Sequence, residues 1–299
     1  MANLTGKLMA DFPGNTMANW TDAVAGNSIG ISADLSADIS AGILTDTSAG
    51  QHGRAGAVLG NVAGLYLRRA RDAAPHAVPQ VVAHAGEGLD GDSARGPLSP
   101  RQLLVAGTPA YRRLDLPANA LRENLLLDID SATLRSGQLL ALGADAVLQL
   151  TFACEPCARL NMRQDRLARS IGAQRGMLAR VLAGGLVRVG DPVRLLPHTM
   201  PAWPDDWRGR VEAVLARVPD GMVVDYRQLA LLAGVALAYC RVFPRVAREL
   251  GVTQRAVPLR SSSLLPRWDG AGLFDRTDPP AWPDAGRAAH QAGCASSKV

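Results

Sequence analysis

The sequence predicts an α+β protein in which a β-rich barrel is followed by a small helical domain. Between residues 57 and 198, short apolar runs are separated by Gly, Asp and Pro, which is the pattern of strands joined by turns. From residue 208 to 275 the apolar residues recur at helical spacing instead. We therefore expect two domains, 57–198 and 208–275, with residues 199–207 as the linker between them.

The two ends of the chain have a different composition. Residues 1–56 are rich in Ala, Gly, Ser, Thr, Asp and Asn, and their Leu and Ile residues are too sparse to build a core. Residues 276–299 are rich in Pro, Ala and Gly. We expect a disordered, flexible leader over 1–56 and a flexible tail over 276–299.

The expected barrel contains several strand-like runs and two helix-like stretches. "GQLLALG" and "AVLQLTF" are apolar runs of strand length, and "GLVRVGDPVRL" predicts a hairpin or a tight corner around Gly190-Asp191-Pro192. The stretches "SPRQLLVAGTPAYRRL" and "LNMRQDRLARSIG" are interpreted as helical. The first domain should therefore be a barrel decorated by a few helices.

Three short helices are expected in the second domain. Residues 211–218 carry valine and leucine at helical spacing, and residues 243–250 repeat that spacing behind Pro244. Between them, Asp225 is suited to cap the start of a helix, and Gly234 is suited to end it.

Bulk properties narrow the class of protein. The chain has 299 residues, a net charge of +5 and a pI of about 9.4, which permits an anionic partner without requiring one. Four cysteines in so long a chain do not form a disulfide framework. No apolar run approaches the roughly 20 residues of a membrane span. We expect a cytoplasmic protein with reduced thiols and no membrane partner.

The stretch "LTFACEPCARLN" places Cys154 and Cys157 two residues apart, directly after an apolar run. The pair could be half of a zinc site, a redox dithiol, two small buried residues, or one working thiolate beside a bystander. A zinc site needs four ligands, and the other Cys and His residues are scattered. A thioredoxin-type dithiol opens a helix in a βαβ unit, whereas the surrounding pattern is β-rich.

Several polar residues could assist a single thiolate. Arg101, Arg122, Arg159 and Arg175 all stand near Gly, Pro or Asn positions where loops end, and Asn124 lies beside Arg122 in "LRENL". A nearby arginine stabilises a thiolate and can fork onto an anionic ligand. Each of these arginines alone could equally be a solvated surface residue, so the combination carries the hypothesis.

Six motifs in order resemble those of MOSC domains, the module at the C-terminus of molybdenum cofactor sulfurases. They are "GEGLDGDS", "SPRQLLV", "LRENLLL", "LRSGQLLALG", "CEPCARL" and "QRGMLARVLAGGLVRVGDPVRL", and the resemblance covers about residues 60–196. It implies a β-barrel that binds molybdenum cofactor, and its molybdenum ion, or carries sulfur on one cysteine. Pyridoxal phosphate binding is a further function that we expect from this resemblance.

By that resemblance Cys157 is the catalytic residue and metal ligand, and Cys154 is a variable neighbour. The residues expected to shape the cofactor pocket are Arg101, Arg122, Asn124 and Arg175. The chain is then a molybdenum-cofactor-dependent oxidoreductase or a sulfur-transfer protein. Because some members of the family act in enzymes that reduce N-hydroxylated bases, a role in detoxifying modified bases is one hypothesis. The reaction and substrate stay open.

Residues 208–270 are similar to the DNA-binding domain of O6-alkylguanine-DNA alkyltransferases and alkyltransferase-like proteins. "PDGMVVDYRQLALLAG" carries the likeness, which implies a winged-helix-like domain in which Tyr226 and Arg241 contact DNA around a flipped base. The family's Pro-Cys-His-Arg acceptor is replaced by Pro258, Leu259 and Arg260. Leucine has no nucleophilic atom, so no alkyl transfer is expected. The alternative function is therefore non-catalytic binding of DNA lesions.

Overall fold

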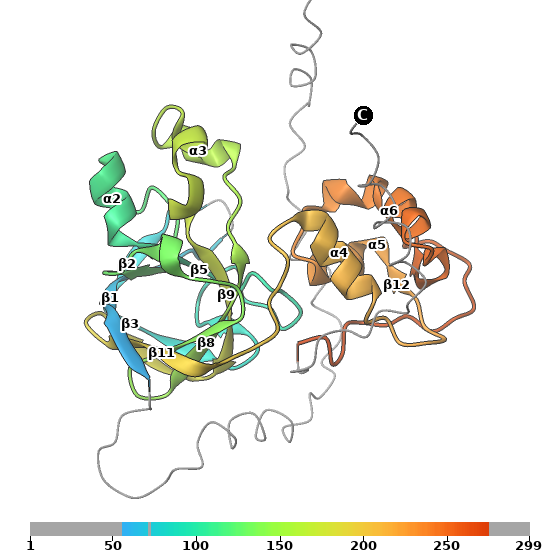
Figure 1. Cartoon of the computed structure of the whole chain (residues 1–299), viewed down its shortest axis with the longest axis horizontal. Helices are drawn as coiled ribbons and strands as arrows, with labels where there is room; N and C mark the ends of the chain where they lie inside the picture. The colour runs from blue at the N-terminus through green and yellow to red at the C-terminus, as the bar shows by residue number, and fades with distance from the viewer. Residues whose placement is uncertain (1–55, 71–72, 275–299) are drawn as a thin grey trace, which may run out of the picture.

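The computed structural model describes residues 56–70 and 73–274 (Figure 1). The leader predicted over residues 1–56 lies outside these ranges except for its last residue, and the tail predicted over residues 276–299 lies outside them entirely. In chain order the strands of the first part are β1 (Ala57–Leu67), β2 (His76–Val78), β3 (Gln80–His84), β4 (Gly88–Leu89), β5 (Leu103–Gly107), β6 (Leu125–Leu127), β7 (Gln138–Leu142), β8 (Ala146–Ala153), β9 (Met177–Ala183), β10 (Gly185–Arg188) and β11 (Pro192–Thr199).

Seven of these strands close into a barrel, as the sequence predicted. Their order is β11-β7-β8-β9-β5-β6-β1, and pairing of β11 with β1 completes the ring, with β2 attached to β1. Neighbours in the ring are antiparallel except for β5 and β6, which are parallel. Closure pairs the edges of the sheet that would otherwise be open. A smaller sheet, β10-β3-β4, lies beside the ring.

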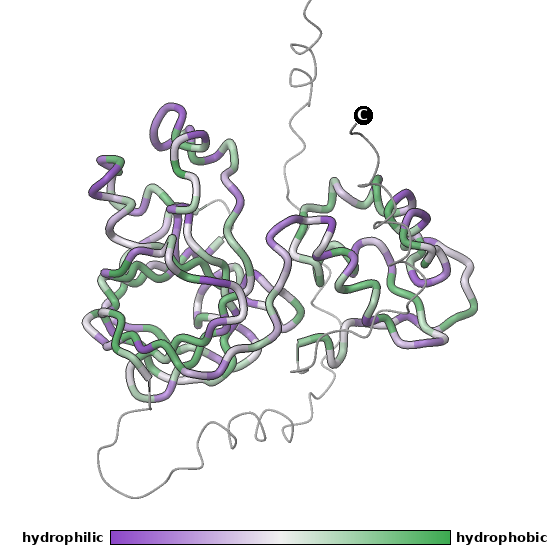
Figure 2. Tube along the Cα trace, in the orientation of Figure 1, coloured by the Kyte–Doolittle hydropathy of each residue, from purple (hydrophilic) through white to green (hydrophobic). Residues whose placement is uncertain are grey.

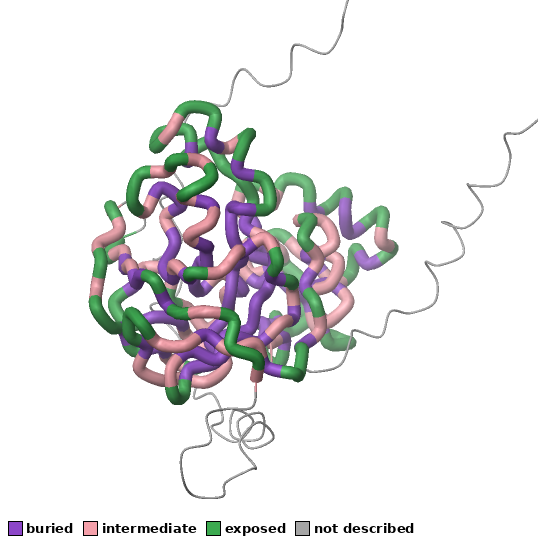
Figure 3. Tube along the Cα trace, turned by 60° about the vertical axis from the view of Figure 1, so that its left-hand side comes forward, coloured by how far each residue is buried: buried purple, intermediate pink, exposed green. Residues whose placement is uncertain are grey.

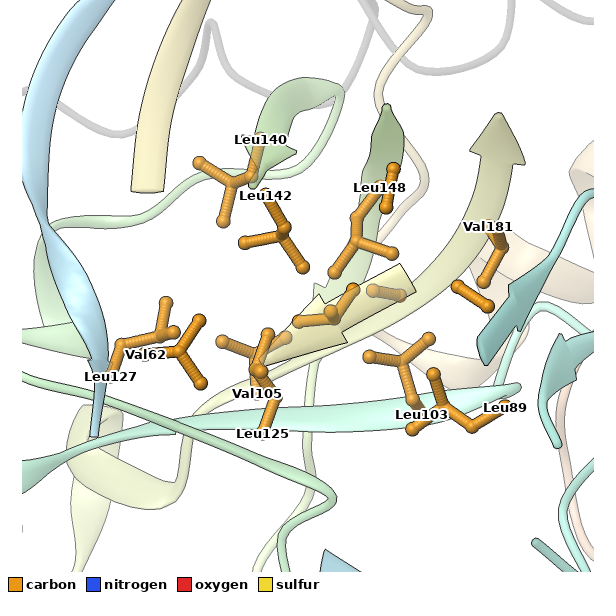
Figure 4. Close-up of a cluster of buried hydrophobic side chains, with 14 of the residues drawn as sticks. Val62, Leu89, Leu103, Val105, Leu125, Leu127, Leu140, Leu142, Leu148 and Val181 are labelled. Atoms are coloured by element: carbon orange, nitrogen blue, oxygen red, sulfur yellow. The ribbon is translucent and has the colours of Figure 1, made fainter. Parts of the chain in front are cut away.

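The barrel interior is a packed apolar core (Figure 4). Side chains from alternate positions, such as Leu103 and Val105 of β5, point into it. A cavity of about 10 Å³ remains, lined only by leucine, valine and alanine side chains. A cavity of that size and lining stays dry and holds no ligand. A binding site must therefore lie outside the barrel interior.

Strand β5 is buried on both faces because three cores meet on it. Leu103 and Val105 face the barrel core, Leu104 faces the helical module, and Ala106 faces a small third core. The run "LLVAG" therefore has no polar side at all. For this reason the helix predicted across "SPRQLLVAGTPAYRRL" is wrong in its first half. Residues 103–107 pair with β6 and β9, and only α2 (Thr108–Leu114) is helical.

Two long connections between strands stand on one side of the barrel (Figure 1). The parallel pair β5 and β6 is joined through α2, and β8 and β9 are joined through η2 (Ala158–Met162), α3 (Leu167–Ser170) and η3 (Gly172–Arg175). Ala106, Ala110, Leu121, Leu160, Leu167 and Ile171 form the third core beneath them. The single helix predicted over "LNMRQDRLARSIG" is thus wrong, because Arg166 (φ +59°) and Gly172 (φ +49°) break it into short turns.

The stretch "GLVRVGDPVRL" forms a corner between two sheets rather than a hairpin. Strand β10 pairs with β3, whereas β11 pairs with β1 and β7. Gly190 turns the chain between them at φ +92°. Of the two expectations for this stretch, the tight corner is confirmed.

The helical module follows the last barrel strand. It contains α4 (Trp207–Leu215), β12 (Val224–Asp225), α5 (Tyr226–Leu232), η4 (Leu237–Arg241), α6 (Phe243–Glu249), η5 (Thr253–Arg255) and β13 (Ala256–Val257). The predicted N-cap is confirmed, since Asp225 Oδ1 accepts from the N–H groups of Arg227 and Gln228 at 2.9 and 3.0 Å. Gly234 adopts φ +62° after α5, as its predicted role requires. The winged-helix character stays a prediction.

Barrel and helical module share one hydrophobic core. Phe152 and Cys154 of the barrel pack in the same buried cluster as residues of α4, α5 and α6. In Figure 2 the hydrophobic stretches follow both the barrel strands and the module, and Figure 3 shows buried segments through the middle of the molecule. No helix among the described residues is long and apolar enough to cross a membrane.

Candidate functional site

The two cysteines of the "CEPC" stretch lie in opposite environments. Cys154 is 6% exposed in the core shared with the helical module, and its N–H donates to the carbonyl of Gly176 at 2.9 Å. Cys157 is exposed at the position before η2, where its carbonyl accepts from the N–H of Leu160 at 3.0 Å. Both are free thiols. The geometry presents one thiol to an incoming partner and removes the other from solvent.

The connection that carries Cys157 is strongly basic. Residues 154–175 hold five arginines and two acidic residues, a net charge of +3. Arg163, Arg166 and Arg169 on this connection are exposed. Fixed positive charge beside an exposed thiol favours an anionic partner, and guanidinium groups match phosphate geometry.

Arg175 is a buried cation at the end of η3. The residue as a whole is 7% exposed, and its Nη1 donates to the carbonyl of Leu121 at 2.8 Å. Its buried Nε has no hydrogen-bond partner among the described residues. The next residue, Gly176, has φ +95°, and a Cβ there would lie 2.2 Å from the carbonyl oxygen of Val105. Only glycine fits this position, so the backbone fixes where the guanidinium sits.

A buried carboxylate and phenol lie close to Arg175, and sequence reasoning missed both. The hydroxyl of Tyr111 on α2 lies 2.7 Å from each carboxylate oxygen of Glu123, which is fully buried. Burial raises the pKa of Glu123, and the Tyr111 hydrogen bond and the charge of Arg175 offset this only in part. Burial and the neighbouring Glu123 also raise the pKa of Tyr111. The only signal for Glu123 was a charged residue two positions before the apolar run "LLL".

Asn124 sits at the centre of a buried network that joins three segments of the barrel. Its Oδ1 accepts from the N–H of Leu104 at 3.1 Å and from Arg68 at 3.0 Å. Its Nδ2 donates to Asp92 Oδ2 at 2.7 Å and to the carbonyl of Tyr66 at 3.2 Å. The amide is therefore fully used inside the protein, and its contact with a cofactor stays a prediction.

The remaining two predicted pocket arginines lie apart. Arg122, at φ +55°, donates through Nη2 to the carbonyl of Ala73 at 3.3 Å. Arg101 donates to the carbonyl of Gly234 at 2.8 Å, and its guanidinium carbon lies 5.9 Å from the ring centre of Phe152. Arg122 and Arg175 thus flank Leu121 on the crossover side, whereas Arg101 faces the helical module. Asn124 is likewise engaged elsewhere.

The residues predicted to contact DNA lie close together in the helical module. Tyr226 is half-buried and packs edge-on against Phe243, with ring centres 6.1 Å apart. The carbonyl of Tyr226 lies 3.3 Å from the Sγ of Cys240, the residue before the exposed Arg241. Leu259, at the position of the missing acceptor, is exposed. DNA contact by Tyr226 and Arg241 stays a prediction.

Two expectations about bound groups can be tested against the side chains available. Within residues 56–70 and 73–274 no group of three or more His, Cys, Asp or Glu side chains could hold a metal ion. Pyridoxal phosphate is held through a lysine Schiff base. The chain's lysines, Lys7 and Lys298, both lie outside the described ranges, so pyridoxal phosphate binding has no support there.

Comparison with protein families gives one match, which lies in the first domain. Residues 102–194 match the family described as "MOSC domain". The matched range contains Cys157 and every predicted pocket residue except Arg101. MOSC domains bind molybdenum cofactor or act in sulfur transfer. No match was found among curated proteins.

Three solved structures match part of this chain at low sequence identity. The YuaD protein of Bacillus subtilis is 16% identical, with a TM-score of 0.41, covering 48% of this chain and 97% of its own. YiiM of Escherichia coli is 18% identical, with a TM-score of 0.39, covering 64% of this chain and 94% of its own. YiiM of Geobacillus stearothermophilus is 13% identical, with a TM-score of 0.35, covering 67% and 93%. Likenesses at this level carry no information on activity.

Proposed function

We propose that this chain binds molybdenum cofactor, or relays sulfur, through the thiolate of Cys157. The observation that carries the proposal is the contrast between the exposed Cys157 and the buried Cys154 at the end of β8, inside the MOSC domain. A thiolate is a sound ligand for a soft metal centre. The apolar, filled barrel interior leaves no space for a ligand, so the cofactor would bind at the outer face that carries Cys157.

The residues around Cys157 fit such a cofactor in part. Bound molybdenum cofactor would supply two-electron redox chemistry at a site that the thiolate of Cys157 helps to hold. The basic connection of residues 154–175 would attract the phosphate of the pterin, and the unpartnered Nε of Arg175 is one buried donor available on that side. Arg122 lies on the same side, while Arg101 and Asn124 are engaged within the protein.

The sulfur-relay form of the proposal needs only the thiol and a donor persulfide. The Cys157 thiolate attacks the outer sulfur of the donor, the donor's S–S bond breaks, and the donor leaves as a thiolate. Cys157 then carries the persulfide, and no net oxidant is consumed. Because Cys154 is buried, it is poorly placed to intercept an incoming donor.

The test is cofactor content after expression in a host that makes molybdenum cofactor. Molybdenum is measured by mass spectrometry and pterin by fluorescence after oxidation, for the wild type, Cys157→Ser and the matched control Cys154→Ser. We expect stoichiometric metal that is lost in Cys157→Ser and kept in Cys154→Ser. If both variants keep pterin and the molybdenum content does not depend on Cys157, cofactor binding would be assigned to the arginines instead. Absence of metal, pterin and persulfide from the wild type would refute the proposal.

We extend the proposal to modified bases as the substrate class. N-hydroxylated bases are substrates of enzymes that contain some MOSC domains, which is the sole support for this step. The test compares survival of a deletion strain and its complemented form on N-hydroxylated base analogues. Equal survival would remove this substrate class and leave cofactor binding untouched.

The alternative proposal is that the helical module binds DNA lesions without repairing them. The contact between Tyr226 and the residue preceding Arg241 gathers two of the expected DNA-binding groups on one part of the module. The test is a gel shift with duplexes that contain O6-alkylguanine, for the wild type and Arg241→Ala. Binding unaffected by Arg241→Ala, or no preference for the lesion, would count against it.

A further inference from the structure

We propose that the helical module positions the working thiol, through Asp205 and Arg210. The segment they hold is residues 153–157, called here the Cys157 loop. This inference rests on the proposed function, in which Cys157 is the reactive group. Asp205 and Arg210 are positioning residues, because they touch the loop and not the thiol.

Two bonds tie the Cys157 loop to α4 and to the segment that leads directly into it. The N–H of Ala153 donates to Asp205 Oδ1 at 2.9 Å, and Arg210 Nη2 donates to Glu155 Oε1 at 2.7 Å. These ties fall four and two residues before Cys157. On the barrel side, the N–H of Cys154 donates to the carbonyl of Gly176. The loop is thus held from both domains immediately before the thiol.

Arg210 is a rigid anchor. Its side chain is fully buried on α4, its Nε donates to the carbonyl of Ala233 at 3.1 Å, and its Nη1 donates to the carbonyl of Asp205. The guanidinium carbon lies 4.0 Å from the ring centre of Phe152, the last fully buried residue of β8 before the loop, which packs in the core shared with the helical module. A guanidinium fixed on so many sides loses little further freedom when it binds a carboxylate.

Of the two residues in the ion pair, Glu155 is the one whose position depends on it, because Arg210 is buried and Glu155 is half exposed. Arg210 would keep its carbonyl and ring contacts without Glu155, whereas the Glu155 side chain is 49% exposed and has this one ion pair among the described residues. A carboxylate half in solvent adds little to stability. The main consequence of the pair is therefore that the loop before Cys157 is held in one place.

The same helix supplies a matched control. Arg208 of α4 pairs with Glu249 of α6, which is the same chemistry between two elements of the module. That pair makes no contact with the Cys157 loop among the described residues. Glu249 also accepts from Arg245, so Glu249→Gln removes a carboxylate with two arginine partners without releasing the loop, and Glu155→Gln removes the tie.

The experiment measures loop order and thiol reactivity on the full chain. Glu155→Gln, Asp205→Ala and Glu249→Gln are compared with the wild type by amide hydrogen exchange over residues 153–157. The rate at which iodoacetamide alkylates Cys157 is followed by peptide mass spectrometry, which separates Cys157 from the other cysteines. Thermal midpoint and bound molybdenum and pterin are measured on the same samples.

We expect Glu155→Gln to exchange loop amides about tenfold faster, alter the Cys157 alkylation rate, and lower cofactor retention with a nearly unchanged thermal midpoint. Asp205→Ala should act in the same direction, and Glu249→Gln should match the wild type. If Glu155→Gln fails to fold, Asp205→Ala carries the same test.

Unchanged exchange and alkylation in both loop variants would overturn the inference, even if Cys157-dependent cofactor is present. Conversely, a wild type without molybdenum or pterin would remove the cofactor proposal. Faster exchange and altered alkylation in the loop variants alone would then still support the positioning role. The two failures are therefore distinguishable.

Discussion

Replacing Arg210 by methionine tests how strongly the two domains depend on one buried side chain. Methionine has a similar length but no donors, so the carbonyls of Ala233 and Asp205 lose a partner, at about 1–3 kcal/mol for a buried group. The lost stacking on Phe152 adds roughly 2 kcal/mol, of which a sulfur–aromatic contact restores about half. Glu155 is half exposed, so its lost pair adds only about 0.5 kcal/mol.

The guanidinium no longer has to be desolvated in the variant, which offsets part of these losses. The net expectation is a loss of about 3 kcal/mol, or a fall in thermal midpoint of roughly 10 °C for a domain pair of this size. Urea unfolding is followed by tryptophan fluorescence, to which Trp207 at the start of α4 and Trp203 in the shared core contribute. Arg208→Met on the same helix is the control and should leave the midpoint nearly unchanged. A loss below about 1 kcal/mol in Arg210→Met would refute this reasoning.

Gly234→Ala should lower stability by about 1–3 kcal/mol, because the new Cβ would lie 3.0 Å from Phe152 Cζ at φ +62°. Gly221→Ala, at φ +75° with nothing within 4 Å, should lose less in the same urea titration. The raised pKa of Glu123 means that its stabilising contribution is lost as pH rises from about 4.5 through the folded value. Over that pH window the free energy of unfolding of the wild type should therefore fall relative to that of Glu123→Gln. The fall should be steeper in a Tyr111→Phe background, because the hydrogen bond that lowers the pKa of Glu123 is lost. Parallel curves of unfolding free energy against pH for the wild type and Glu123→Gln would contradict this.

Local sequence patterns determined the helix ends and strands whose formation depends on residues that are adjacent in the chain. Asp225 and Gly234 delimit α5 because capping and left-handed turns are properties of a few consecutive residues. The ordered motifs around Cys157 sufficed to indicate the family whose model matches residues 102–194, and apolar runs such as "AVLQLTF" sufficed for strand β8. The strand LLVAG was misassigned because a run buried on both faces has no period that separates strand from helix.

Only the tertiary structure decided which residues surround Cys157. Glu155 and Arg210 are 55 positions apart, and Arg101 meets Gly234 across 133 positions, so no local spacing relates them. Tyr111 and Glu123 come together because α2 folds back along the crossover between β5 and β6. The sequence by itself indicated one thiol and several arginines in a region that resembles the MOSC family. Which of these arginines bond across the two domains depended on barrel closure and on the core that the domains share.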